Sequence, residues 1–123
     1  MDAGTDIGTG HAWIVDAYGC DPARLRSTDA LARLFADAVR EMELVPVREP
    51  VWHVFGGPGG VTGFLLLSES HLAVHTFPER GFAAIDLYCC RPRAPWRWRE
   101  ALEEALGAAS VVVRCTPRGG DPT

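Results

Sequence analysis

The feature that most constrains the fold is the segment from residue 61 to residue 90, which has the pattern of three strands in immediate succession. Residues 61–67 are strongly apolar, and residues 69–77 and 82–90 form two further candidate strands. A Pro-Glu-Arg-Gly turn separates the last two. Strands joined by connections this short are antiparallel neighbours in a sheet. The sequence therefore predicts a mainly antiparallel sheet at the centre of the fold.

The rest of the chain supplies two helices and three more strands. Helix caps at residues 27–29 precede an apolar stripe at helical spacing that runs to Met42, and Pro95 opens a second helix that ends before Gly107. Candidate strands cover residues 11–18, 45–55 and 110–115. The expected order of elements is β-α-β-β-β-β-α-β.

This order predicts an α+β fold, in which both helices cover one face of a single sheet as a two-layer α/β sandwich. Residues 1–123 are expected to form one domain, with loose ends at 1–9 and 116–123. Several strands are apolar on both sides, so the second face of the sheet needs cover. A second copy of the chain would provide that cover and would give a four-layer αββα arrangement.

The composition excludes several classes of protein. All twelve basic residues are arginine, and this excludes a lysine-bound pyridoxal phosphate, a P-loop lysine and a lysine nucleophile. The formal net charge of -4 argues against a nucleic-acid-binding surface. No apolar run is long enough to span a bilayer, and the first residues do not form a signal peptide. A cytoplasmic protein that does not bind membranes is therefore expected.

Neither the glycines nor the metal-binding residue types form a recognised site. The glycine-rich loop at 56–60 lacks the GxGxxG register and precedes a strand rather than a helix, so a phosphate-binding loop is not expected. The four cysteines lack CxxC spacing, and the four histidines show no HExxH or zinc-finger pattern. The sequence predicts no metal site, and a reducing compartment suits these cysteines better than disulfides do.

Polar side chains are concentrated in the segment from 61 to 90, although each buried polar group in a sheet needs a partner. A serine, threonine or histidine at one such position usually serves the sheet itself, and only the concentration indicates a functional site. The polar positions are Thr62, Ser68, Glu69, Ser70, His71, His75, Thr76, Glu79, Asp86 and Cys90.

Side-chain alternation separates the two neighbouring cysteines of the last candidate strand in this segment. Cys89 has the parity of Ile85 and Leu87, so it is expected to be a buried core thiol. Cys90 has the parity of Asp86 and is therefore the better candidate for reactive chemistry.

These residues resemble the short bacterial and archaeal form of S-adenosylmethionine decarboxylase, a self-processing, pyruvoyl-dependent enzyme family. The resemblance extends from about His11 to Cys115. The motifs that carry it are residues 67–71 (LSESH), 75–79 (HTFPE), 60–63 (GVTG) and 16–20 (DAYGC), together with Cys90.

The resemblance implies that the chain cuts itself between Glu69 and Ser70. The hydroxyl of Ser70 would attack the Glu69 carbonyl, and elimination would leave a pyruvoyl group in place of Ser70. Thr62 would hydrogen-bond the tetrahedral intermediate, and His75 would be the base that drives elimination. The products would be a β chain of residues 1–69 and an α chain of residues 70–123.

The pyruvoyl group implied by the resemblance also fits the absence of lysine. Its carbonyl would form a Schiff base with the substrate amine and accept electrons when CO2 leaves, without pyridoxal phosphate and without a metal. The resemblance places the proton donor at Cys90, since a thiol can protonate the substrate carbon near neutral pH.

The resemblance also implies substrate contacts. Glu79 matches a family glutamate that binds ribose hydroxyls, and Phe55 matches an aromatic residue that stacks on adenine. Phe77 replaces the tryptophan common in the HTWPE motif of the family, so a difference in pocket shape is expected. Cys89 stands where the family usually has threonine.

The leading interpretation is a decarboxylase of S-adenosylmethionine, which makes the aminopropyl donor for spermidine synthesis. The self-processing motif reports on the cofactor rather than on the substrate. An arginine or ornithine decarboxylase with the same machinery therefore stays open, as does a non-catalytic homologue that acts as a partner. The resemblance further implies a homodimer with active sites at the interface between the subunits.

Overall fold

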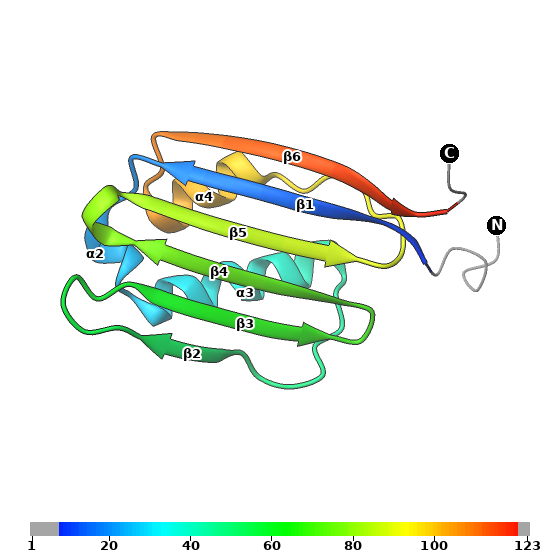
Figure 1. Ribbon diagram of the computed structural model, residues 1–123, viewed down its shortest axis with the longest axis horizontal. Helices are drawn as coiled ribbons and strands as arrows, with labels where there is room; N and C mark the ends of the chain where they lie inside the picture. Colours follow the sequence, from blue (N-terminus) through cyan, green and yellow to red (C-terminus); the bar gives the residue numbers. More distant parts are fainter. Residues whose placement is uncertain (1–7, 121–123) are drawn as a thin grey trace.

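The computed structural model describes residues 8–120, which form one six-stranded sheet with helices on one face (Figure 1). The strand order is β2-β3-β4-β5-β1-β6, and every neighbouring pair is antiparallel. The predicted α+β fold with two layers is therefore confirmed.

The strands are β1 (Thr9–Tyr18), β2 (Val51–Val54), β3 (Val61–Leu67), β4 (Ser70–Phe77), β5 (Phe82–Cys89) and β6 (Ser110–Gly119). The helices are α2 (Pro22–Leu25), α3 (Thr28–Met42) and α4 (Trp98–Leu106), and a short 3-10 turn, η1 (Pro78–Arg80), joins β4 to β5. Strands β2 to β5 follow one another as a meander, and β1 lies between β5 and β6. Within residues 8–120, no helix has the length and apolar character needed to cross a membrane.

Helix α3 forms where a capped start meets an amphipathic stripe. The hydroxyl of Ser27 accepts a hydrogen bond from the Ala30 N–H at 3.1 Å, and the helix ends at Glu43 with a left-handed φ of 55°. The apolar stripe predicted from the spacing is buried against the sheet. Its buried members are Leu31, Leu34, Phe35, Ala38 and Met42.

Helix α4 begins at Trp98 rather than at Pro95, where the sequence predicts its start. The Glu41 carboxylate of α3 accepts hydrogen bonds from Trp96 Nε1 and Arg97 Nε, each at 2.8 Å. Because both donors lie just before α4, these contacts hold the start of α4 beside the end of α3.

The strand expected at residues 45–55 is shorter than predicted, because only β2 forms there. Pro46 and Pro50 lack the N–H that a strand ladder requires, so pairing is interrupted between β2 and residues 45–47, where the Val47 N–H donates to the Leu66 carbonyl at 2.9 Å. Pro46 makes an isolated bridge with Leu67 instead.

The element order expected from the sequence has no helix between residues 18 and 27, but the structure forms the short helix α2 there, from Pro22 onward. The Asp21 side chain caps this helix by accepting a hydrogen bond from the Ala23 N–H at 3.0 Å. The Leu25 carbonyl at its end accepts a hydrogen bond from the buried Thr76 hydroxyl at 2.8 Å. Helix α2 thereby supports the end of β4.

The prediction of a loose C-terminal segment is wrong for residues 116–119, which extend β6. They pair with the start of β1, where Thr9 lies opposite Gly119, so Thr9 also belongs to the sheet. Residues 116–119 and Thr9 carry no strong strand pattern of their own. They are extended because β1 and β6 pair with each other along their whole length. Of the other residues expected to be loose, Gly8 donates a hydrogen bond to the Cys90 carbonyl at 2.8 Å and Gly120 lies in a bend, while residues 1–7 and 121–123 lie outside the described residues.

The face of the sheet opposite the helices is open and partly apolar. Figure 1 shows α3 and α4 behind the sheet, with none of the described elements in front of it. Large apolar side chains are exposed there: Ile14 (41 %), Phe64 (42 %), Leu66 (47 %) and Val112 (39 %). The cover that the sequence predicts for this face is therefore not provided within one protomer.

Candidate active site

The predicted cleavage site lies in the tight hairpin between β3 and β4. Ser68 and Glu69 form the turn, and Leu67 pairs with Ser70 across it. The hairpin lies at the same edge of the sheet as the end of β5 (Figure 1), because Ser70 is also paired with Cys89. The bond between Glu69 and Ser70 therefore joins a turn to the first residue of a central strand.

Glu69 is held at its carbonyl and at its side chain. Its carbonyl oxygen accepts a hydrogen bond from the Cys90 N–H at 3.0 Å. Its carboxylate forms a two-pronged ion pair with the Arg91 guanidinium, in which Nη2 lies 2.6 Å from Oε1 and Nε contacts Oε2. Hydrogen bonding from Arg91 lowers the pKa of Glu69, so this carboxylate is ionised near neutral pH.

Ser70 faces the helical layer, where it meets a buried thiol. Its cross-strand partner Cys89 is only 2 % exposed, and residues paired in register share one face of the sheet. Burial raises the pKa of the Cys89 thiol, while Arg93 and a hydrogen bond from Ser70 act in the opposite direction. The same Arg93 donates a hydrogen bond to the Met42 carbonyl at the end of α3, at 3.0 Å.

The orientation predicted for the two cysteines is confirmed. Cys89 is buried with the core, whereas Cys90 is half-buried. By alternation along β5, Cys90 belongs to the open face, on the side of Asp86 and Tyr88. The thiol predicted to be reactive is therefore the more accessible of the two.

Thr62 and His75 form a second polar pair at the opposite end of β4. They lie opposite each other on β3 and β4, and the Thr62 hydroxyl oxygen is 3.2 Å from His75 Nδ1. Both belong to the open face by alternation.

A hollow of about 370 Å³ lies beside this pair. The loop after β2 and the end of β4 form its walls, and it contains all three residues predicted to bind substrate. It is lined by Phe55, Gly56, Pro58, Gly60, Thr62, His75, Thr76, Phe77 and Glu79.

Close backbone packing fixes one wall of this hollow. A Cβ atom on Gly60 would lie 2.6 Å from the Thr76 carbonyl oxygen, so a side chain there would displace the loop. The Thr76 hydroxyl accepts a hydrogen bond from the Val61 N–H at 2.9 Å. The glycine-rich loop therefore shapes the hollow.

The predicted site residues thus form two groups at opposite ends of the sheet. Glu69, Ser70 and Cys90 lie at the hairpin end, and Thr62 and His75 lie at the other. Five residues of extended strand separate Ser70 from His75, which is roughly 16 Å. Their side chains also point to opposite faces. Within one protomer, His75 does not reach Ser70.

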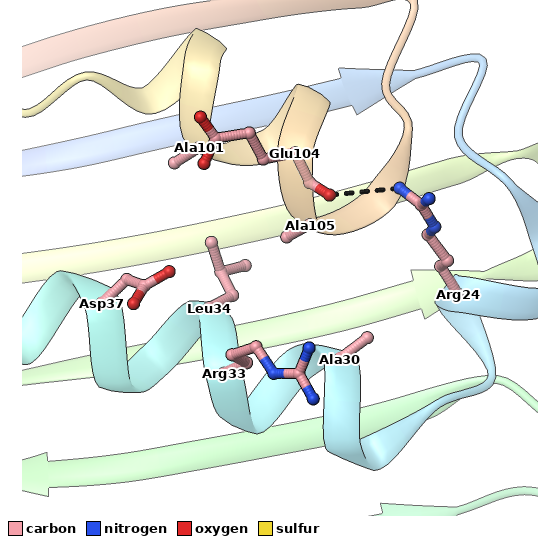
Figure 2. Close-up of a pocket in the computed structure, with 8 residues that line it drawn as sticks. All are labelled: Arg24, Ala30, Arg33, Leu34, Asp37, Ala101, Glu104 and Ala105. Carbon is pink, nitrogen blue, oxygen red and sulfur yellow. Dashed lines mark hydrogen bonds between the residues drawn. The ribbon is translucent and has the colours of Figure 1, made fainter.

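Another hollow, of about 310 Å³, lies between α3 and α4 on the outer side of the helical layer (Figure 2). Figure 2 shows Arg24 reaching across to α4, where its Nη1 donates a hydrogen bond to the Glu104 carbonyl at 3.1 Å. No thiol, hydroxyl or imidazole lines this hollow. It contains none of the predicted site residues. Across residues 8–120, no group of three or more His, Cys, Asp or Glu side chains is arranged to hold a metal ion.

Three contacts at the hairpin have no counterpart in the sequence predictions. They are the ion pair of Arg91 with Glu69, the Cys90 N–H on the Glu69 carbonyl, and the contact of Ser70 with Cys89. Arg91 follows a strand and belongs to no periodic pattern, so the sequence carries no signal for its partner. The Cys89 contact depends on the register between β4 and β5, which alternation alone does not define.

Comparison with known proteins gives consistent matches over most of the chain. Residues 11–119 match the family described as S-adenosylmethionine decarboxylase. A relative named "S-adenosylmethionine decarboxylase proenzyme" from Geobacillus kaustophilus is 38% identical over 109 residues, which cover 89% of this chain and 86% of that protein. A relative named "S-adenosylmethionine decarboxylase proenzyme 2" from Halalkalibacterium halodurans is 38% identical over 110 residues, which cover 89% and 85%.

A solved structure has the same arrangement of strands and helices. The crystal structure of the adenosylmethionine decarboxylase from Aquifex aeolicus superimposes with a TM-score of 0.75 at 26% sequence identity, covering 91% of this chain and 92% of that one. The likeness therefore covers most of both chains.

Proposed function

The chain belongs to the S-adenosylmethionine decarboxylase family, and from this premise we propose that it is a self-processing enzyme that decarboxylates S-adenosylmethionine. The product is the aminopropyl donor for spermidine synthesis. The names of the relatives favour this substrate over arginine or ornithine, and they favour an enzyme over a non-catalytic partner. The word proenzyme in those names supports a chain that is cut before it becomes active.

The observation that carries the proposal is the hydrogen bond from the Cys90 N–H to the Glu69 carbonyl, at 3.0 Å. Ser70 Oγ attacks this carbonyl carbon, and negative charge develops on the oxygen that Cys90 already contacts. The bond from Glu69 to the Ser70 nitrogen then breaks. The hydroxyl proton passes to that nitrogen as the ester forms, so no outside reactant is needed.

His75 acts in the second step, in which a base removes the Cα proton of residue 70. The main-chain α-carboxylate of Glu69 leaves as the bond between the ester oxygen and Cβ of residue 70 breaks, giving a dehydroalanine at residue 70. Water then replaces the nitrogen, ammonia is released, and a pyruvoyl group ends the α chain. Thr62 lies 3.2 Å from His75 Nδ1 and so orients the imidazole for the proton transfer.

The position of residue 70 fits a group that must stay fixed after the chain is cut. Residue 70 begins β4, which pairs with β5 along its whole length and with β3 over residues 70–75, so cutting before it leaves the strand in the sheet. The pyruvoyl group supplies a carbonyl that captures the substrate amine and withdraws electrons as CO2 leaves. Cys90, half-buried and next to the cut, is the residue we assign to donate a proton to the substrate carbon.

The separation of the two polar groups supports a homodimer with shared active sites. His75 lies roughly 16 Å along β4 from Ser70, so it reaches residue 70 of a second chain rather than its own. A two-fold axis that crosses the strands, between two sheets stacked on their open faces, brings opposite ends of the two sheets together. The same stacking covers the exposed Ile14, Phe64 and Leu66.

The hollow beside His75 has the chemistry to bind a nucleoside. Phe55 and Phe77 line it with exposed aromatic rings that can stack on adenine, and Glu79 offers a carboxylate to two ribose hydroxyls. In the shared arrangement, this hollow lies beside residue 70 of the partner chain.

Mass spectrometry of the denatured protein, together with CO2 release, tests the proposal. The expected result is two fragments divided between residues 69 and 70, and CO2 from S-adenosylmethionine but not from arginine or ornithine. The α chain is expected to resist Edman sequencing, because a pyruvoyl end has no free amine. One uncut chain that stays uncut would contradict self-processing. Cleavage without CO2 from S-adenosylmethionine would contradict the substrate.

A further inference from the structure

Three consecutive residues at the end of β5 each contact a different part of the dipeptide that is cut. The first contact is the Cys90 N–H, which donates to the Glu69 carbonyl oxygen at 3.0 Å. It fixes the direction of the carbonyl and stabilises charge on that oxygen. Because the donor is a backbone N–H, any residue at position 90 except proline can make this hydrogen bond.

The second contact is the ion pair of Arg91 with the Glu69 carboxylate. Both side chains are partly shielded, at 27% and 30% exposed, and the guanidinium uses two nitrogens on two oxygens. A two-pronged pair of this kind restrains rotation as well as distance. Together with the Cys90 N–H, it holds Glu69 at its carbonyl and at the end of its side chain, so the residue in the turn has little freedom to rotate.

The third contact is made by the Cys89 thiol, which lies opposite Ser70 on β5. The Ser70 hydroxyl donates a hydrogen bond to it on the helical side of the sheet. Cys89 is 2 % exposed and is packed among core residues, so its sulfur is a fixed point. Arg93 also interacts with this thiol, and it donates a hydrogen bond to the Met42 carbonyl at 3.0 Å. The Ser70 side chain is therefore held by its hydroxyl in one direction, on the helical side of the sheet.

We propose that Cys89, Cys90 and Arg91 form a clamp that positions the Glu69–Ser70 bond for self-cleavage. Cys89 and Arg91 are positioning residues in this clamp, and the Cys90 N–H is the group that contacts the reacting oxygen. The inference rests on the proposed self-processing and identifies which residues set its first step. In that step Ser70 Oγ bonds to the Glu69 carbonyl carbon, the Glu69 C–N bond breaks, and the hydroxyl proton moves to the Ser70 nitrogen.

The clamp predicts how the rate of ester formation responds to substitution. Loss of either positioning contact lets the hydroxyl or the carbonyl leave the attacking geometry, and a misplacement of about 1 Å is enough to slow such a step roughly 100-fold. We expect Arg91→Ala and Cys89→Ala to slow ester formation by roughly 10- to 100-fold. Cys89→Ser keeps a hydrogen-bonding group at the same place and is expected to recover most of the rate.

The experiment measures the ester directly, in chains made by a short pulse of cell-free synthesis. All variants carry His75→Ala, which stops the reaction at the ester, and hydroxylamine then cuts the ester and leaves a hydroxamate on Glu69. Cut chain is counted by mass spectrometry against time. Arg33→Ala and Cys115→Ala are the matched controls, since both side chains lie outside the clamp and Cys115 is exposed. The controls are expected to form ester at the rate of the parent.

A double substitution separates positioning by the ion pair from general damage to the fold. If Glu69 and Arg91 act as one unit, Glu69→Gln with Arg91→Gln is no slower than either change alone. Arg91 lies in a surface loop, so its variants test the clamp even if Cys89→Ala fails to fold. Parent-like rates for both Arg91→Ala and a folded Cys89→Ala, or an equal loss in Arg33→Ala, would overturn the clamp alone. A wild-type chain that is never cut would overturn the clamp and the proposed function together.

Discussion

The Nδ1 atom of His75 lies 3.2 Å from the hydroxyl oxygen of Thr62, across the ladder between β3 and β4. If Nδ1 donates to the hydroxyl, Nε2 is left as the free base of the imidazole, and the ring is held in one orientation. Thr62 therefore affects the proton transfer by orienting His75. This role is separate from the hydrogen bond to the tetrahedral intermediate that the family resemblance implies for Thr62.

Thr62→Val is expected to slow elimination by roughly tenfold, because it removes the hydroxyl but preserves the shape of the side chain. The ester then accumulates and becomes detectable with hydroxylamine. His75→Ala is expected to accumulate more ester, since it removes the base itself. Thr62→Ser is the matched control and should process normally. Normal processing in Thr62→Val would contradict the role of the hydroxyl.

Co-expression of two inactive chains tests the shared active site. Ser70→Ala lacks the nucleophile and His75→Ala lacks the base, so each is expected to stay inactive alone. In a mixed dimer, the His75→Ala chain provides Ser70 and its partner provides His75, which completes one site. Random pairing makes half of the dimers mixed, so about a quarter of the wild-type number of sites is expected.

Tags of different mass on the two chains show which of them is cut. Cleavage confined to the His75→Ala chain is the expected pattern, and it appears only in the mixed sample. Absence of any cut chain in dimers shown to be mixed would contradict a site shared between protomers.

Cys90→Ala is expected to separate processing from turnover. The substitution removes the thiol but retains the N–H that donates to the Glu69 carbonyl, so the chain should be cut at the normal rate. Release of CO2 should fall by roughly 100-fold or more, because the proton donor is absent. Fragment analysis and CO2 release on the same sample check both expectations. Full activity would place the proton donor elsewhere.

Much of the fold was accessible from the sequence because its signals are local. Alternation along β5 predicts that Cys89 is buried and Cys90 is not, and capping at Ser27 marks the start of α3. The pairing of Thr62 with His75 follows from the two-residue turn at Ser68 and Glu69, whereas the sequence begins the second strand at residue 69 and so predicts this turn one residue too short. Because Leu67 lies opposite Ser70, each step back along β3 matches one step forward along β4.

The arrangement of the candidate site was less accessible, because it depends on contacts between distant residues. The motif places Ser70 and His75 five positions apart, yet extended strand geometry separates them by roughly 16 Å and on opposite faces. Arg91 reaches Glu69 only because the end of β5 lies beside the hairpin. Such contacts require the register of three strands at once.

Glu41 gives the fold a specific sensitivity to acid. Hydrogen bonds from Arg97 and Trp96 lower the pKa of Glu41 from 4.5 to about 2. Since the folded state holds this carboxylate ionised, its contribution to stability is complete above pH 4.5 and is lost as the pH falls toward 2. Glu41→Gln should therefore lower stability at neutral pH and flatten its decline in acid. Urea unfolding at several pH values between 2 and 7 measures this, and Glu103→Gln on the exposed side of α4 is the control.

Glu79→Gln is expected to weaken substrate binding without changing self-cleavage. A carboxylate accepts hydrogen bonds from both ribose hydroxyls with two equivalent oxygens, whereas an amide has only one accepting oxygen. Hydrogen bonds to a charged group contribute about 1.5–3 kcal/mol, so KM should rise by roughly 10- to 100-fold. Glu79 lines the hollow beside His75 but takes no part in ester formation or elimination, so the fragments should form at the normal rate. A rise in KM for S-adenosylmethionine that is absent in Glu100→Gln would support the assignment. An unchanged KM would mean that Glu79 does not bind the ribose, and the substrate would then need another carboxylate or a different hollow.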